Sequence, residues 1–166
     1  KEVLESPGFD QDLAEAFRHR LALLSWDGDA LWRELEAICE EGKDKDYVGN
    51  FRYAEAERIV EALGRQGSRH AERMMGLLAV KIEDFENNPQ KWMEPLMVRL
   101  AGELRHEPAV PLIVDKMHDE EDEVTRDRAI TDMTKIGTDG VVHSLQDAYP
   151  AGNWHFRLYA QGPLGQ

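Results

Sequence analysis

A chain of 166 residues is long enough for one ordinary domain with a buried core, and we expect a single continuous domain. Its 20 basic and 33 acidic residues leave a net charge of −13, which repels phosphate backbones and argues against nucleic-acid binding. The longest apolar stretch, residues 74–80, is far shorter than a bilayer span, so no membrane partner is expected.

The two ends of the chain and its single cysteine indicate its origin and its cellular compartment. It does not begin with Met, and residues 161–166 carry no periodic pattern, so we expect a piece of a longer protein. Residues 1–12 contain acids and a Pro-Gly pair where a signal peptide would need an apolar stretch. Cys39 has no second cysteine with which to form a disulfide, and this favours a reducing, cytoplasmic location.

The first two elements are predicted to be amphipathic helices, because apolar residues recur every three or four positions. One covers residues 13–24 and the other covers 31–39, with Asp27 or Asp29 as N-cap of the second helix and Gly42 as its stop. The two apolar stripes are Leu13, Phe17, Leu21 and Leu24, and then Leu31, Leu35, Ile38 and Cys39.

The rest of the chain continues the same helical period, and almost nothing predicts a strand. A third helix follows Asn50 and is broken by Gly64 or Gly67, and a turn is expected at 87–89. Short turns between consecutive helices indicate antiparallel neighbours, about eight or nine helices in all. The remaining stripes are Ala56, Ile59, Val60 and Leu63; Met75, Leu78, Ile82 and Phe85; Met93, Leu96, Met97, Leu100 and Leu104; Val110, Ile113, Val114 and Met117; Ala129, Ile130, Met133 and Ile136; and Val141, Val142, Leu145, Ala148 and Tyr149.

The C-terminal third contains an internal repeat. Four pairs of similar residues stand 31 positions apart: Val110 and Val141, Val114 and Leu145, Arg126 and Arg157, and Ala129 and Ala160. A second offset of 32 relates Leu104 to Ile136, Val110 to Val142, and Ile113 to Leu145. Periods of this length built from helix pairs predict a solenoid, in which each hairpin buries one face on its neighbour.

The residues of this repeat resemble those of a HEAT repeat. The apolar segment 107–117 opens near Pro111, Asp119 stands in the turn that follows, and Arg126 and Ala129 belong to the second helix. In HEAT repeats a proline, an aspartate and a basic residue occupy these places. The resemblance therefore implies an all-α fold, an α-α superhelix of antiparallel helical hairpins.

The resemblance does not extend evenly along the chain. It covers residues 90–160 well and residues 50–85 faintly. We therefore predict HEAT-like repeats over 49–166 and an N-terminal helical hairpin or cap over 1–48. HEAT-like proteins commonly offer an extended concave surface to a partner, so the resemblance implies a protein partner of unknown identity.

No set of residues in the sequence indicates catalysis, a cofactor or a metal, and we assign none. His118 and the acids at 120–123 lack the calcium-loop pattern and are better explained as a solvated turn. His106-Glu107 is similar to the His-Glu pairs with which the HEAT-like deoxyhypusine hydroxylases hold two irons, but that family uses four pairs. Cys39 stands on the apolar side of a helix beside acids that would raise its pKa, so a core position is favoured.

The C-terminal aromatics form the most interesting candidate surface. Trp154, Phe156 and Tyr159 either face a partner or pack inward on Val141 and Leu145. Because aromatic and arginine side chains anchor interfaces, the predicted partner-binding residues are Arg99, Arg126, Trp154, Arg157 and Tyr159.

The function that these patterns predict is a scaffold for protein–protein interaction, without enzymatic activity. Two alternatives stay open from the sequence. One is a HEAT-like enzyme that depends on a metal or a chromophore, which bound metal or colour in the purified protein would reveal. The other is a self-assembly module, in which the C-terminal end forms a homodimer.

Overall fold

The structure is a computed structural model that describes residues 10–82, 84–118 and 122–164. Within these residues the chain is all-helical and forms no strand. The α-helices are α1 (Gln11–Leu23), α2 (Gly28–Gly42), α3 (Tyr53–Arg65), α4 (Ala71–Leu78), α5 (Gln90–Leu104), α6 (Val110–Lys116), α7 (Glu123–Ile136), α8 (Asp139–Ala148) and α9 (Trp154–Leu164). Short 3-10 turns precede three of them, η2 (Val48–Asn50), η3 (Ser68–His70) and η4 (Glu107–Ala109).

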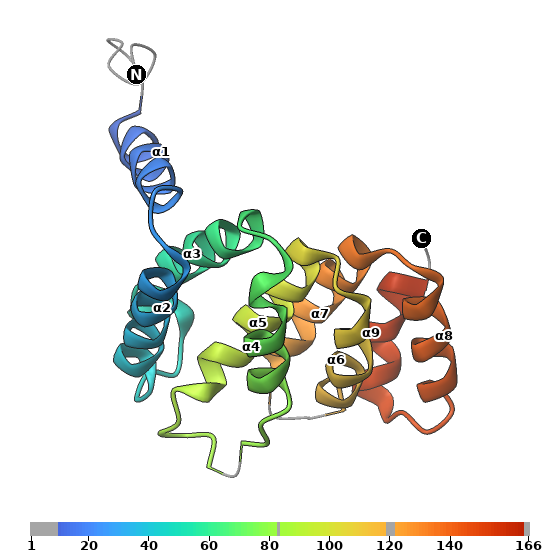
Figure 1. Cartoon of the computed structure of the whole chain (residues 1–166). Helices are drawn as coiled ribbons and strands as arrows, with labels where there is room; N and C mark the ends of the chain where they lie inside the picture. The colour runs from blue at the N-terminus through green and yellow to red at the C-terminus, as the bar shows by residue number, and fades with distance from the viewer. Residues whose placement is uncertain (1–9, 83, 119–121, 165–166) are drawn as a thin grey trace.

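The helices are arranged in two rows that follow the chain. The odd-numbered helices pack on one another in order, α1 on α3, α3 on α5, α5 on α7 and α7 on α9. Each of α2, α4, α6 and α8 packs on the odd-numbered helix that comes next. As a result α1 and α9 lie at opposite ends of the molecule, and α1 leans out from the other helices (Figure 1).

Local sequence signals explain where the helices begin and end. The carboxylate of Asp27 caps α2 by accepting from the backbone N–H of Ala30 at 2.7 Å, as one of the two predicted N-caps would. Helix α2 ends at Gly42 as expected. Asp122 caps α7 by accepting from the N–H of Thr125 at 2.8 Å, and Gly137 stops α7 with φ of 61°. Helix α7 begins at Glu123 and α9 begins at Trp154, the same 31-residue offset that the sequence repeat has.

The prediction of one helix over 75–85 is wrong. Helix α4 ends at Leu78, and neither Ile82 nor Phe85 belongs to a helix. Further along this segment the side chain of Asp84 accepts from the backbone N–H of Glu86 at 3.2 Å. Asp and Asn side chains that bond nearby amides in this way favour turns over helix.

The core is one continuous apolar cluster that runs from Leu23 to Ala160. Most of the predicted stripes from the second helix onward contribute to it, including Leu35, Ile59 and Leu100, which have no exposed surface. No helix within the described residues is long and apolar enough to cross a membrane.

Candidate functional site

The predicted contact residues Arg99 and Arg126 lie in intramolecular contacts. Arg99 on α5 forms ion pairs with Glu57 and Glu61 of α3, and its side chain is only 13% exposed. Arg126 on α7 is buried, and its guanidinium lies 5.4 Å from the centre of the Tyr159 ring. Arg99 thus links α5 to α3, and Arg126 links α7 to α9. That either arginine also binds a partner remains a prediction.

The other predicted contact residues lie on α9. The aromatic side chains of this helix, Phe156 included, divide between two faces. Phe156 is fully buried and stacks on the imidazole of His118, with 4.2 Å between the ring centres. Tyr159 is half-buried beside Arg126. Trp154 points outward and is 69% exposed. The sequence left open whether these aromatic side chains pack inward or face a partner. In the structure Phe156 packs inward, whereas Trp154 faces solvent.

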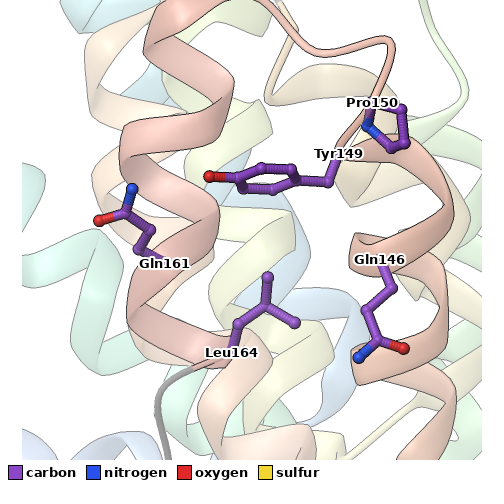
Figure 2. A pocket seen from close by; sticks show the side chains of 5 residues that line it. All are labelled: Gln146, Tyr149, Pro150, Gln161 and Leu164. Carbon is purple, nitrogen blue, oxygen red and sulfur yellow. The ribbon is translucent and has the colours of Figure 1, made fainter.

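A cavity lies beside the outward face of α9, between α8 and α9. It has a volume of about 400 Å³ and is lined by Gln146, Tyr149, Pro150, Gln161 and Leu164, so its wall is mostly apolar (Figure 2). Figure 2 shows the Tyr149 ring reaching from the end of α8 toward α9, with Leu164 below it.

The remaining predicted residue, Arg157, fixes one wall of this cavity. Its guanidinium donates to the carbonyl oxygens of Tyr149 at 3.2 Å and Pro150 at 3.0 Å. It also lies 5.8 Å from the centre of the Tyr149 ring. The link joins α9 to the turn that ends α8, and so it positions Tyr149 and Pro150, two residues of the cavity wall.

A row of exposed apolar side chains runs along α1 and ends in the turn just after it, where the sequence predicted only an amphipathic helix. Leu13, Phe17, Leu21 and Leu24 are 48%, 42%, 59% and 43% exposed. Their spacing of four, four and three residues places them on one side of the helix. We call these four residues the α1 stripe.

Two polar contacts join α1 to α3. Arg20 pairs with Glu61 at 3.1 Å, and Nε2 of His19 lies 3.4 Å from Glu55. Of the larger apolar side chains on this helix, only Leu23 is buried. Helix α1 thus buries Ala14 and Leu23 and leaves the larger apolar side chains of the α1 stripe largely in solvent, whereas a helix that covers a core buries its main apolar row.

The metal-ligating side chains and the thiol of Cys39 are the groups that bear on possible catalysis. No group of three or more His, Cys, Asp or Glu side chains there could hold a metal ion. The acids 119–121 next to His118 lie outside the described residues. Burial, with Glu36 nearby, raises the pKa of the Cys39 thiol to about 12, so its sulfur stays protonated and unreactive.

Comparison of the chain with protein-family models, with curated proteins and with solved structures finds no match.

Proposed function

We propose that the chain is a protein-binding scaffold of the HEAT-like kind, and that the α1 stripe docks into an apolar groove of a partner protein. The supporting observation is the outward orientation of the four large apolar side chains on one side of a helix that leans away from the other helices (Figure 1). Scattered apolar residues are common on protein surfaces, whereas a contiguous row typically marks an interaction site.

Burial of the α1 stripe against a partner protein is expected to lower the free energy. Covering a large apolar side chain that was exposed contributes up to about 1.5–3 kcal/mol, so four half-exposed side chains offer several kcal/mol. Anchors at positions i, i+4, i+8 and i+11 are the pattern of a helix that lies in a groove. The scaffold itself needs no rearrangement, because α1 is already formed and attached to α3 through Arg20 and His19.

The HEAT-like part of the proposal is supported by the order of packing and by the repeat. Successive odd-numbered helices stack on one another, and two of them begin 31 residues apart. Each hairpin in such a stack covers its neighbour, and the outer faces of the terminal helices are left for partners. The net charge of −13 supports a protein partner over a nucleic acid.

Site-specific photocrosslinking tests the proposal. A benzoylphenylalanine is placed at Phe17 in the stripe, and in a matched variant at Ala22, which is exposed on the same helix but off the stripe. In cells that naturally produce the chain, we expect a covalent adduct with one other protein from position 17 and none from position 22. Equal labelling from both positions, or no adduct from position 17, would contradict the proposal.

A second variant separates loss of binding from loss of folding. Replacing Phe17 and Leu21 by Gln removes apolar contact from the stripe while leaving Leu23 and the α3 contacts in place. We expect the adduct from a probe at Leu13 to disappear in this variant while its circular dichroism and thermal unfolding stay unchanged. An adduct that survives the double substitution would place the partner elsewhere.

A further inference from the structure

The end of the molecule opposite α1 has a second exposed apolar face. Trp154 and Leu158 on α9 are 69% and 49% exposed, and Gln161 follows them on the same side of the helix. Val142 and Gln146 on α8 are also exposed. We call these five residues the terminal face.

An apolar side chain projects from the terminal face, and a mostly apolar recess lies next to it. Trp154 is the projection, because its large ring is mostly in solvent. The recess is the cavity of about 400 Å³ whose wall includes Tyr149, Gln161 and Leu164 (Figure 2). Trp154 does not line this cavity in its own chain, and its ring contacts the imidazole of His155 edge-on while most of its surface faces solvent.

The charge distribution indicates where two copies could meet. Between residues 139 and 164 there are two acids, Asp139 and Asp147, and one base, Arg157, which gives a net charge of −1. The other residues therefore have a net charge of −12 out of the total of −13. Two identical acidic molecules repel each other least where charge is lowest. A basic partner would instead be drawn to the acidic remainder of the surface.

We propose that two copies of the chain pair through their terminal faces, with α9 lying antiparallel to α9 of the second copy and a two-fold axis at Leu158. Positions equally far from residue 158 then face each other, so Trp154 of one copy lies opposite residue 162 of the other. Gln161 and Leu164 on either side of that position belong to the cavity wall. The two-fold contact makes the insertion reciprocal, and each Trp154 enters the recess of the other copy.

The composition of the terminal face agrees with a second copy of the chain as its partner. The central parts of protein interfaces are poor in charge and often contain a large aromatic side chain, and the terminal face has no charged residue and contains Trp154. An interface built from a single hairpin is at the small end of the usual range, so we expect a dimer that dissociates at micromolar concentrations. This pairing uses a surface separate from the α1 stripe and goes beyond the proposed function.

Sedimentation equilibrium of the full chain tests the pairing, over concentrations from about 5 µM to about 500 µM. We expect a reversible monomer–dimer equilibrium that strengthens as salt rises, because salt screens the repulsion between acidic copies. Leu158→Asp brings two carboxylates together at the axis and should leave only monomer. Trp154→Ala should raise the dissociation constant of the dimer at least tenfold, because the substitution removes an interface anchor. The matched control, Leu21→Asp in the α1 stripe, should leave the dimer unchanged.

Disulfide trapping gives a readout that does not depend on affinity. Because residue 158 meets its own copy at the axis, Leu158→Cys should give a covalent dimer under mild oxidation, while Leu21→Cys should not. The native Cys39 is buried and does not contribute. A wild-type chain that stays monomeric throughout, or a dimer that Leu21→Asp abolishes and Leu158→Asp does not, would overturn the pairing. Neither result would bear on crosslinking at Phe17, so the two proposals fail separately.

Discussion

The indole N–H of Trp32 on α2 donates to Nδ1 of His70, 3.2 Å away and 38 residues further along the chain. Both side chains are buried, and His70 stands where η3 passes into α4. The bond requires Nδ1 to be unprotonated, so it exists only while the imidazole is neutral. Burial, together with Arg69 and Arg73, lowers the pKa of His70 and favours that neutral form.

This lowered pKa predicts a pH dependence of stability. The unfolded chain takes up a proton at His70 near pH 6.5, before the folded chain does, so acidification favours unfolding. The contribution is fully present above pH 6.5 and falls below it by at most about 1.4 kcal/mol per pH unit. Urea unfolding between pH 7.5 and pH 5.5 measures this, with His70→Asn as the reference in which the term is absent. Equal pH dependence in the two proteins would show that His70 does not contribute.

Gly102 and Gly76 should respond oppositely to alanine. A Cβ at Gly102 on α5 would lie 2.6 Å from Cβ of Asp132 on α7, so Gly102→Ala should cost about 1–3 kcal/mol by overpacking. At Gly76 on α4 a Cβ would meet nothing within 4 Å, so Gly76→Ala should stabilise by up to about 1 kcal/mol through helix propensity. Chemical denaturation of both variants tests this pair. A stabilising Gly102→Ala would mean that α5 and α7 are less closely packed than described.

The orientation of α1 can be tested with two leucines in one turn of helix. Leu23 is 1% exposed and lies outside the predicted stripe, so Leu23→Ala should cost about 2–5 kcal/mol. Leu21 is 59% exposed, so Leu21→Ala should change stability by less than about 0.5 kcal/mol. Thermal unfolding at a low protein concentration compares the two variants. The reverse order would mean that the stripe faces the core.

Cys39 should report unfolding of the α2 region. Its thiol is buried, and burial raises its pKa to about 12, so the native protein should react with a thiol reagent only after the chain opens. Because this is the only cysteine, the absorbance of released nitrothiobenzoate measures that opening directly. We expect full reaction within seconds in denaturant and protection by orders of magnitude in buffer. Rapid labelling of the native chain would contradict the burial of Cys39.

Glu57 on α3 joins α5 and α7 by pairing with Arg99 and Arg128. Glu57→Gln should cost about 1–3 kcal/mol, because two partly buried guanidinium groups then lose the carboxylate that they share, although Arg99 keeps its pair with Glu61. The control is Glu40→Gln at the exposed Glu40–Lys43 pair, which should change stability by less than about 0.5 kcal/mol. Equal costs in urea unfolding would show that the Glu57 contacts act only as surface ion pairs.

Much of the fold follows from sequence because helices are specified locally. The spacing of Ala56, Ile59 and Leu63 predicts both a helix and its buried side, and the Asp27 cap and the Gly42 stop are recognisable from residue type. The same local logic failed after Leu78, where the apolar period continues to Phe85 but the helix does not.

The candidate site could be predicted only in part. The sequence identified the aromatic cluster of α9, yet it could not separate Trp154, which faces solvent, from Phe156, which stacks on His118. It predicted Arg99 and Arg126 as contact residues because arginine is typical of interfaces, and the structure places both in intramolecular contacts. The exposure of the α1 stripe left no sign in the sequence, since an amphipathic period looks the same whichever way the helix is turned.

By itself the sequence determined the helical class, boundaries such as the Asp27 cap and the Gly42 stop, and the acidic charge, because each of these depends on residue type and local spacing. Tertiary structure alone decided which apolar rows are covered, since that depends on which helix lies next to which. It turned α1 so that Arg20 meets Glu61 and the stripe meets solvent. It also brought the end of α8 beside α9 to form the cavity, which no spacing along the chain encodes.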